Sequence, residues 1–265
     1  MDSGLWMVEA APSAALRPYV TRLVAYREGY DAPLERTEYP WTGVVLVFGF
    51  GAALECAGVQ VTSFAAGLSD RPTHTRIRAL TQGVEVFLTP FGARRLLGMP
   101  MSEVANRIVP VDDLFGRWGG AAVARLAEQP TWREQVRLVD RLLMERIHDA
   151  PELGPQVPWA WARLLESGGA VSVASLADAL GWSHRHLVAR FHDQVGLSPK
   201  AVARVVRFNR ALSLLTPEVS LAELAAECGF YDQAHMNREF RALSGTTPGQ
   251  IRPIAPYLDG ATIDA

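Results

Sequence analysis

The sequence predicts an α+β fold: a β-rich N-terminal region, forming a sheet or barrel-like domain with helices, and an all-α C-terminal region of two similar helical units joined by a long helix. Three observations predict it. Short β-branched and apolar runs occupy the first 90 residues. After Pro90, apolar residues recur at helical spacing. One order of residues then occurs twice. We expect domains at 1–155 and 156–255, and a tail at 256–265.

The predicted strands are short and lie between Gly, Pro, Ser or Asp residues, which favour turns. Thr75–Leu80 also alternates polar and apolar residues, as a strand with one buried face does. The segment Leu16–Tyr26 fits either a helix or a strand. The strands expected after it are Val44–Phe50, Val59–Ala65, Thr75–Leu80 and Val84–Thr89.

Helices are expected between the strands and the repeat. The clearest is Thr131–Ile147, where Thr131 and Glu134 form a capping box. Ser102 is the expected cap of a shorter helix. Pro151–Pro158 contains three prolines and a glycine, which predict a linker. The other expected helices are Phe91–Leu97, Ser102–Arg107 and Trp159–Glu166.

The repeat has a nearly constant offset. Two pairs, Leu176-Ala177 and Gly181-Trp182, recur 48 residues later as Leu224-Ala225 and Gly229-Phe230. After one added residue the offset is 49, and it relates Leu187, Phe191, Gly196 and Pro199 to Met236, Phe240, Gly245 and Pro248. Two copies at this spacing predict one structural unit built twice.

Each copy has the features of a helix-turn-helix unit. Gly181 and Gly229 stand where a helix would end in a left-handed residue. Ser220 and Glu223 form a capping box that opens the second copy. The second helix of such a unit presents its first turns outward, toward a DNA major groove. Pro199–Leu215 is expected to be the long helix that joins the units.

Charge is concentrated near this joining helix. The whole chain has a net charge of −2, but residues 183–210 hold six cations and one acid, a local charge of +5. Such a stripe fits an anion-binding face, although a solvated helix face is the alternative. Arg185 could pair with guanine and Gln233 with adenine. The candidate DNA-binding residues are Ser183, His184, Arg185, Val188, Arg190, Lys200, Arg204, Arg207, Asp232, Gln233, His235, Asn237 and Arg238.

The second copy carries the most specific motif, residues 225–240 followed by Gly245-Thr246-Thr247-Pro248. With the first copy, it resembles the AraC/XylS family of bacterial transcription regulators over Trp159–Arg252. The resemblance implies two recognition helices entering adjacent major-groove segments of double-stranded DNA, and contact with RNA polymerase if the protein is an activator. Many family members carry a basic residue where this chain has Ala189, so base recognition by the first unit is expected to differ.

The N-terminal region gives a second resemblance. Val84–Ala105 is similar to an uncharacterised sensor-type domain that is often attached to such regulators. The resemblance implies a small-molecule effector, a homodimer, or both. Separately, the helix Thr131–Ile147 is a candidate for the dimer contact. Two alternatives remain for the whole protein. It could be an enzyme domain fused to a DNA-binding module, or an effector-independent regulator whose N-terminal domain is a scaffold.

Several functions are excluded. Tyr39–Leu54, the longest uncharged run, has 16 residues and is too short and glycine-rich to span a membrane. The first basic residue is Arg17, so the N-terminus does not resemble a signal peptide. Lys200 does not follow a glycine-rich loop, which excludes a Walker-type phosphate site. We therefore expect a cytoplasmic protein that has no membrane partner, cofactor or metal and is not an enzyme.

The reactive residues that stand alone in the sequence each have a simple structural interpretation. His74 lies in an expected strand and is assigned a structural role. Cys56 is either a buried, inert thiol or a sensor thiol, and Cys228 packs inside its helix. Arg94-Arg95 would hold an anionic effector or lie on a solvated helix face.

Overall fold

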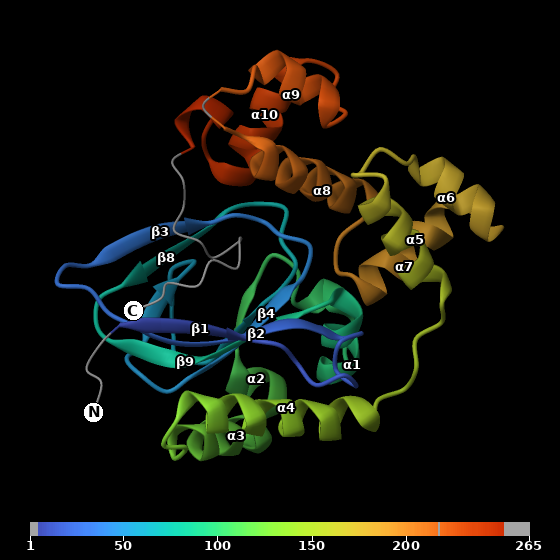
Figure 1. Ribbon diagram of the computed structural model, residues 1–265. Helices are drawn as coiled ribbons and strands as arrows, with labels where there is room; N and C mark the ends of the chain where they lie inside the picture. Colours follow the sequence, from blue (N-terminus) through green and yellow to red (C-terminus); the bar gives the residue numbers. More distant parts are fainter. Residues whose placement is uncertain (1–4, 217, 252–265) are drawn as a thin grey trace.

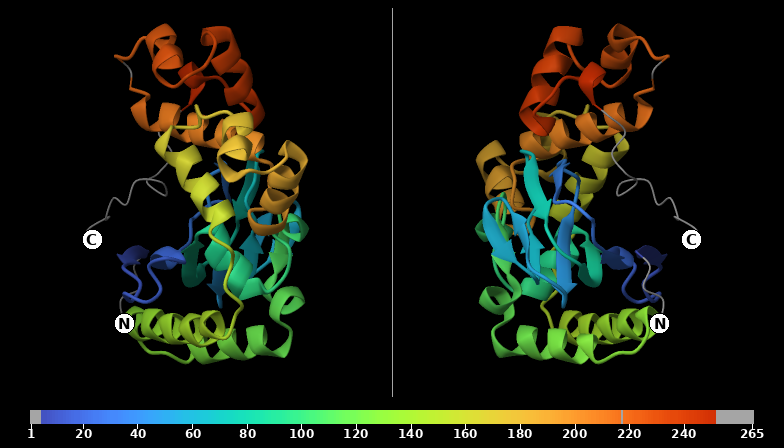
Figure 2. Two further views of the ribbon diagram at one scale, coloured as in Figure 1. Left: turned by 90° about the vertical axis from the view of Figure 1, so that its right-hand side faces the viewer. Right: turned by 90° about the vertical axis from the view of Figure 1, so that its left-hand side faces the viewer.

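The computed structural model describes residues 5–216 and 218–251. The predicted tail 256–265 lies outside these residues. The fold class is confirmed: a strand-rich N-terminal region is followed by a helical C-terminal region (Figure 1). In the side views, the last helices of the chain, drawn in orange and red, lie at one end of the molecule and the green helices lie at the other, with the sheets between them (Figure 2).

The strands form two antiparallel sheets rather than one closed barrel. The six-stranded sheet has the order β1 (Trp6–Ala10), β2 (Val20–Glu28), β9 (Thr81–Leu88), β4 (Val44–Gly49), β7 (Phe64–Ala66) and β10 (Ile108–Pro110). The four-stranded sheet has the order β3 (Leu34–Glu38), β8 (Thr73–Ile77), β5 (Leu54–Cys56) and β6 (Val59–Val61).

Two strand predictions are resolved by tertiary pairing. The segment Leu16–Tyr26, which fitted a helix or a strand, contributes its second half to β2. The single strand expected over Val59–Ala65 is wrong, because this segment belongs to two sheets. The Ser63 hydroxyl donates to the Gly49 carbonyl at 2.6 Å and accepts from the Gly49 amide at 3.0 Å, which holds the bend between β6 and β7.

The six-stranded sheet is buried on both faces. Val84, Val86 and Leu88 of β9 join the main core with α1 (Pro90–Leu97), α3 (Arg117–Ala127) and α4 (Trp132–His148), while α2 (Val111–Phe115) closes its edge. Glu85 and Phe87 alternate with these residues and face the four-stranded sheet instead. The strand therefore separates a packed core from a second, partly open interior.

One expected helix does not form. Ser102–Arg107 contains only a 3₁₀ turn, η1 (Met101–Glu103), and Ser102 lies inside the turn rather than capping it. The residues that follow form a turn, in which Asn106 has φ 58° and donates its backbone amide to the Leu68 carbonyl at 3.0 Å. By contrast, Thr131 caps α4 as predicted, accepting from the Glu134 amide.

The C-terminal helices follow a connection that ends at residue 155. Helix α5 begins inside the expected linker Pro151–Pro158, which is therefore shorter than predicted. The long joining helix is confirmed as α8. The helices are α5 (Gln156–Glu166), α6 (Val173–Leu180), α7 (His184–Gln194), α8 (Pro199–Leu214), α9 (Leu221–Glu227), α10 (Gln233–Ser244) and the 3₁₀ turn η2 (Pro248–Gln250).

Both helical units contact the strand-rich region. Phe91 of α1 packs edge-on against Trp161 of α5, with ring centroids 6.1 Å apart. Tyr39, just after β3, packs edge-on against Phe208 of α8 at 5.9 Å. Arg94 lies 3.7 Å from Asp193 of α7. The two regions are thus joined by apolar contacts and by ion pairs, which include Asp70 with Arg204 of α8.

Candidate nucleic-acid interface

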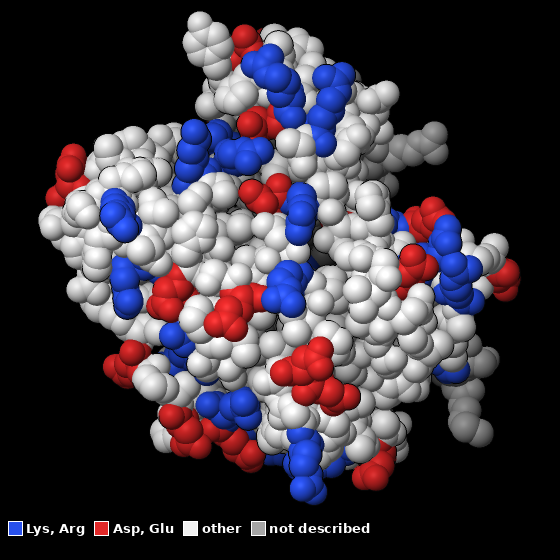
Figure 3. All heavy atoms as spheres, turned by 180° about the vertical axis from the view of Figure 1, so that it is seen from behind, with Lys and Arg blue, Asp and Glu red and all other residues white. Residues whose placement is uncertain are grey.

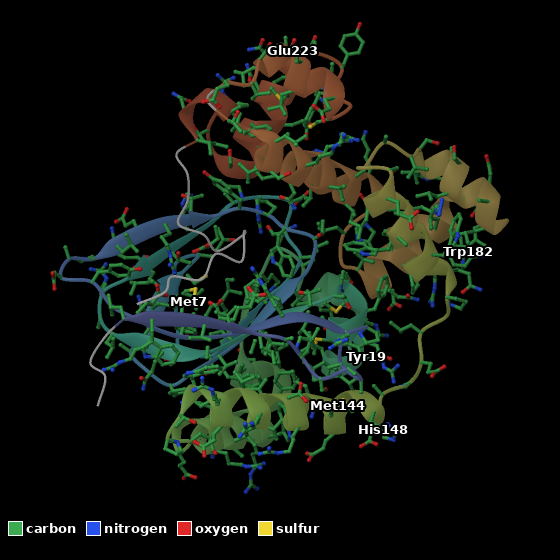
Figure 4. All side chains as sticks on the ribbon, viewed as in Figure 1. Met7, Tyr19, Met144, His148, Trp182 and Glu223 are labelled. Carbon is green, nitrogen blue, oxygen red and sulfur yellow. The ribbon has the colours of Figure 1, made fainter. Side chains whose placement is uncertain are left out.

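The two helical units share the same turn. In the first, α6 ends at Gly181 with φ 65°, and the Trp182 amide bonds to the Ala177 carbonyl at 2.9 Å. In the second, the Phe230 amide bonds to the Ala225 carbonyl, also at 2.9 Å, after Gly229 with φ 72°. The repeat in the sequence therefore corresponds to a repeat in the structure. Trp182 lies where α6 meets α7 (Figure 4).

The second helix of each unit is anchored by one face. Leu187 and Phe191 of α7 and Met236 and Phe240 of α10 have no exposed surface. The opposite faces are exposed. At their starts, Ser183 accepts from the His186 amide and Asp232 from the His235 amide, so both predicted site residues serve as helix caps.

The capping box expected at the start of the second unit is wrong. Ser220 occupies the cap position of α9, but its side chain makes no capping hydrogen bond. Glu223 is exposed and points away from the unit (Figure 4). The short α9 is instead held by burial of Leu224 and Ala225.

Most candidate residues of the first unit lie on the open surface. His184, Arg185 and Arg190 of α7 are exposed and Val188 is half-buried. Arg190 lies 3.9 Å from Asp193, a weak exposed ion pair. Lys200, at the start of α8, is exposed as well. The first unit thus presents cations together with the start of its outward helix.

The candidate DNA-binding residues of the second unit differ in their exposure. Gln233 and Arg238 are exposed on α10, and Asn237 is half-buried between them. His235 is turned into the unit: it accepts from the Tyr231 amide at 3.2 Å and lies against Phe230. Arg241 is also exposed, one turn after Arg238. Sequence reasoning missed it, although its spacing from Arg238 places it on the same helix face.

Two arginines of the joining helix are engaged inside the protein. Arg204 donates to the Glu239 carboxylate of α10 at 2.6 Å. Arg207 donates to the Gly169 carbonyl at 2.7 Å, and burial lowers the pKa of its guanidinium. Both guanidinium groups thus have partners within the protein, and their expected role as phosphate contacts stays a prediction. Helix α8 packs between two units, so residues that would face solvent on an isolated helix bind its neighbours instead.

The positive residues are unevenly distributed. On the face opposite to that of Figure 1, Lys and Arg side chains occur over the helical C-terminal region, while acidic side chains are more frequent toward the end formed by α3 and α4 (Figure 3). This distribution agrees with the local charge of residues 183–210. An anionic polymer would be attracted to the helical end.

The other reactive residues are accounted for within the fold. Burial, with a smaller contribution from Glu38, raises the pKa of the Cys56 thiol to about 12, which favours the inert thiol over a sensor. Cys228 is buried as predicted. Arg95 is half-buried and donates to the Ile147 and Ala150 carbonyls at the end of α4, so its guanidinium is engaged within the protein. His74 pairs with Thr37 across β3 and β8.

The described residues contain no group of three or more His, Cys, Asp or Glu side chains placed to hold a metal ion. Within the same ranges, every helix is too short or too polar to cross a membrane.

A second candidate site lies between the two sheets. It is a cavity of about 160 Å³ lined by side chains of both sheets, among them Tyr26, Trp41, Glu85 and Phe87. Tyr39, which contacts α8, also lines it. The cavity could not be located from the sequence, because it depends on how the two sheets face each other.

Comparison with known families gives two matches. Residues 176–253 match a family described as a helix-turn-helix domain. Residues 8–110 match a domain of unknown function (DUF6597). The second match covers the last three residues of β1 and all of β2 to β10, including the strands that line the cavity.

Two curated relatives align with the C-terminal region. An uncharacterised HTH-type transcriptional regulator, YbfI of Bacillus subtilis, is 36% identical over 66 residues, which are 25% of this chain and 24% of the relative. The HTH-type transcriptional regulator MtrA of Neisseria gonorrhoeae is 34% identical over 83 residues, 31% of this chain and 27% of the relative. The chain thus spans about a quarter of the length of the relatives it matches.

Solved structures resemble the chain more distantly. The C-terminal domain of the response regulator AraT from Geobacillus stearothermophilus is 24% identical, with a TM-score of 0.37, and covers 42% of this chain and 97% of that domain. ToxT from Vibrio cholerae is 11% identical, with a TM-score of 0.46, and covers 92% of this chain and 96% of ToxT.

Proposed function

Since the C-terminal region of this chain is an AraC-type helix-turn-helix domain, we propose that the whole protein is a sequence-specific DNA-binding transcription regulator. The observation that carries the proposal is the duplicated unit. Two helices, α7 and α10, present exposed faces from units at opposite ends of α8 (Figure 1). The 16 residues of α8 span about 24 Å, about two-thirds of the length of one DNA turn, and the two units add to this separation at its ends.

The proposal assigns different contacts to different side chains. Arg185 and Gln233, near the starts of α7 and α10, contact base edges. Arg190, Lys200, Arg238 and the additional Arg241 contact phosphates, because their cations are exposed. The caps Ser183 and Asp232 position the two helices. His184, Val188 and Asn237 complete the surface, and His235 supports it from within the unit.

The N-terminal region is proposed to sense a small molecule in the cavity between the sheets. Tyr39 lines this cavity and contacts Phe208 of α8, so a change at Tyr39 would reach the helix that joins the units. Asp70, between the lining residues Ser69 and Arg71, lies 3.9 Å from Arg204 of the same helix. We also propose domains at 1–155 and 156–255, a homodimer, RNA polymerase contact in activation, and action in the cytoplasm.

Footprinting on a selected operator tests the DNA-binding proposal. The wild-type chain should protect two major-groove segments about 10 base pairs apart, because each unit enters one segment. The triple variant Gln233→Ala, Arg238→Ala, Arg241→Ala should lose one segment and keep the other. Protection of a single segment by the wild-type chain would show that one unit is structural only.

Alanine substitution should change stability at Arg204 and the salt dependence of DNA binding at Arg238. Arg204→Ala removes the charge-assisted hydrogen bond to Glu239 and should lower the free energy of unfolding by about 1.5–3 kcal/mol. Arg238→Ala should leave stability unchanged and reduce the slope of log K against log salt concentration by about 0.9, as for the loss of one phosphate contact. Urea denaturation and salt-dependent DNA binding measure the two effects. A changed salt slope in folded Arg204→Ala would overturn the internal assignment.

A further inference from the structure

The cavity between the sheets has aromatic walls. Tyr26, Phe64 and Phe87 project from the six-stranded sheet, and Trp41 packs edge-on against Phe87 with centroids 5.4 Å apart. Leu54 closes the opposite side. Its volume of about 160 Å³ is comparable to that of a cavity that holds benzene. The space therefore suits one aromatic ring with a small substituent.

Two of the three carboxyl groups that line the cavity have partners. Arg36 donates to both oxygens of Glu28, at 3.1 and 3.2 Å. The Arg36 Nε lies 3.3 Å from Glu38, which also accepts from the Thr75 hydroxyl at 3.1 Å. One guanidinium thus serves two carboxylates. Arg71, the other cation of the lining, is exposed and donates to the Asn106 carbonyl.

Glu85 is the third carboxyl, and it differs from the other two. It lies in the middle of β9, enclosed by protein, yet it keeps accessible surface because it faces the cavity. Among the described residues, none makes a hydrogen bond or ion pair with its carboxyl group. A polar group in such a place is costly unless a partner satisfies it. The missing partner is expected to come from whatever occupies the cavity.

We propose that this cavity binds a small aromatic cation, a primary amine attached to an aromatic ring, whose ammonium group pairs with Glu85 while its ring lies among Tyr26, Trp41 and Phe87. This deepens the proposed function, on which it rests, by naming the chemical class of the effector. A cation is favoured because aromatic faces attract positive charge and because the two other carboxylates already share Arg36. An anion is disfavoured because, among the described residues, the less exposed cation of the lining, Arg36, already serves two carboxylates.

The pairing predicts a pH dependence with a definite sign. Burial, reinforced by the charge of Glu28, raises the pKa of Glu85 to about 8. Tyr26, Glu28 and Arg22 on β2, with Arg36 and Glu38 on β3, are the charged or titratable groups around it. The Glu85 carboxyl group is therefore mostly protonated at pH 7 before a ligand binds. An ammonium ion favours the ionised carboxyl, so binding releases a proton and affinity rises as pH increases toward 8.

The experiment uses the full chain without DNA and three probes of matched shape: benzylamine, benzyl alcohol and benzoate. Calorimetry at pH 7 should show benzylamine binding most tightly and benzoate not at all. Between pH 6 and 7, the benzylamine affinity should rise about tenfold. In buffers of different ionisation enthalpy, the apparent heat should reveal proton release. Tighter binding of benzoate or benzyl alcohol would overturn the proposal.

Two matched variants test whether Glu85 is the group that binds the ammonium ion. Glu85→Gln should weaken benzylamine binding about 10- to 100-fold and abolish proton release, since the charge-assisted hydrogen bond is lost. Glu55→Gln changes a carboxyl on β5 that does not line the cavity, and it should bind like the wild type. Circular dichroism confirms that each variant is folded. Equal affinities for wild type and folded Glu85→Gln would refute the assignment of Glu85.

The same samples separate this proposal from the DNA-binding proposal. If benzylamine binds through Glu85 but the protein binds no DNA, the proposed ligand class is correct and the proposed DNA-binding function is wrong. If the protein binds DNA but not benzylamine, the proposed DNA-binding function is correct and the proposed ligand class is wrong. If both bind, benzylamine should change DNA affinity in the wild type and not in Glu85→Gln.

Discussion

Phe208→Ala is expected to lower the free energy of unfolding by about 3–5 kcal/mol, the cost of removing a buried aromatic ring and leaving a cavity. Phe208 has no exposed surface. Its ring contacts Phe240 of the second recognition helix, with centroids 4.8 Å apart, and Tyr39 of the strand-rich region at 5.9 Å. The substitution should therefore weaken both the second unit and its contact with the N-terminal region. Urea denaturation monitored by circular dichroism measures the loss.

The matched control is Leu214→Ala on the same helix. Leu214 is exposed, so its truncation should change stability by less than about 0.5 kcal/mol. Footprinting adds an independent measurement, because Phe208→Ala should lose protection of the segment bound by α10 before that bound by α7. Equal stability of the two variants would show that Phe208 is not a core residue of the second unit.

Arg185→Ala and Gln233→Ala are expected to remove base preference at two positions about one helical turn apart. Both side chains are exposed near the start of their helices, where recognition helices meet base edges. Arg185 can donate two hydrogen bonds to guanine, and Gln233 can bond twice to adenine. Each bidentate pair discriminates by about 1–3 kcal/mol, so each preferred base should lose roughly 5- to 150-fold selectivity. Selection from random DNA measures the change.

Conservative variants separate base recognition from charge. Arg185→Lys keeps the cation but not the planar fork, so it should lose selectivity while keeping the salt dependence of binding. Gln233→Glu should shift preference toward cytosine, whose amino group donates to a carboxylate. If the alanine variants select the wild-type sequence at lower affinity, both residues position the protein without recognising bases.

Several features could be predicted from sequence because they depend on neighbouring residues. The glycine that ends α6, the cap Thr131 and the apolar spacing of α10 each act within a few positions. The two units were recognisable because the same local pattern occurs twice. The short helix expected at Ser102–Arg107 failed, since pairing of Asn106 with Leu68 outweighed local helix preference.

The roles of charged residues could not be predicted in the same way. Arg204 and Arg238 have equal charge and helical surroundings in the sequence, yet Arg204 binds Glu239 while Arg238 is exposed. Glu85 follows the alternation of an ordinary strand. Nothing near it in sequence shows that its carboxyl faces a cavity, because the opposite wall comes from other strands.

For this protein, the sequence alone determined the order of strand-rich and helical regions, the duplicated helix-turn-helix unit and the concentration of cations beside it. These depend on hydrophobic period, turn residues and composition, which are properties of short segments. Tertiary structure alone decided which cations remain exposed, how Val59–Ala65 divides between two sheets, and that Glu85 meets aromatic side chains in a cavity. Those outcomes depend on burial and on partners distant in sequence, because a side chain's exposure and electrostatic surroundings are set by all the elements packed around it.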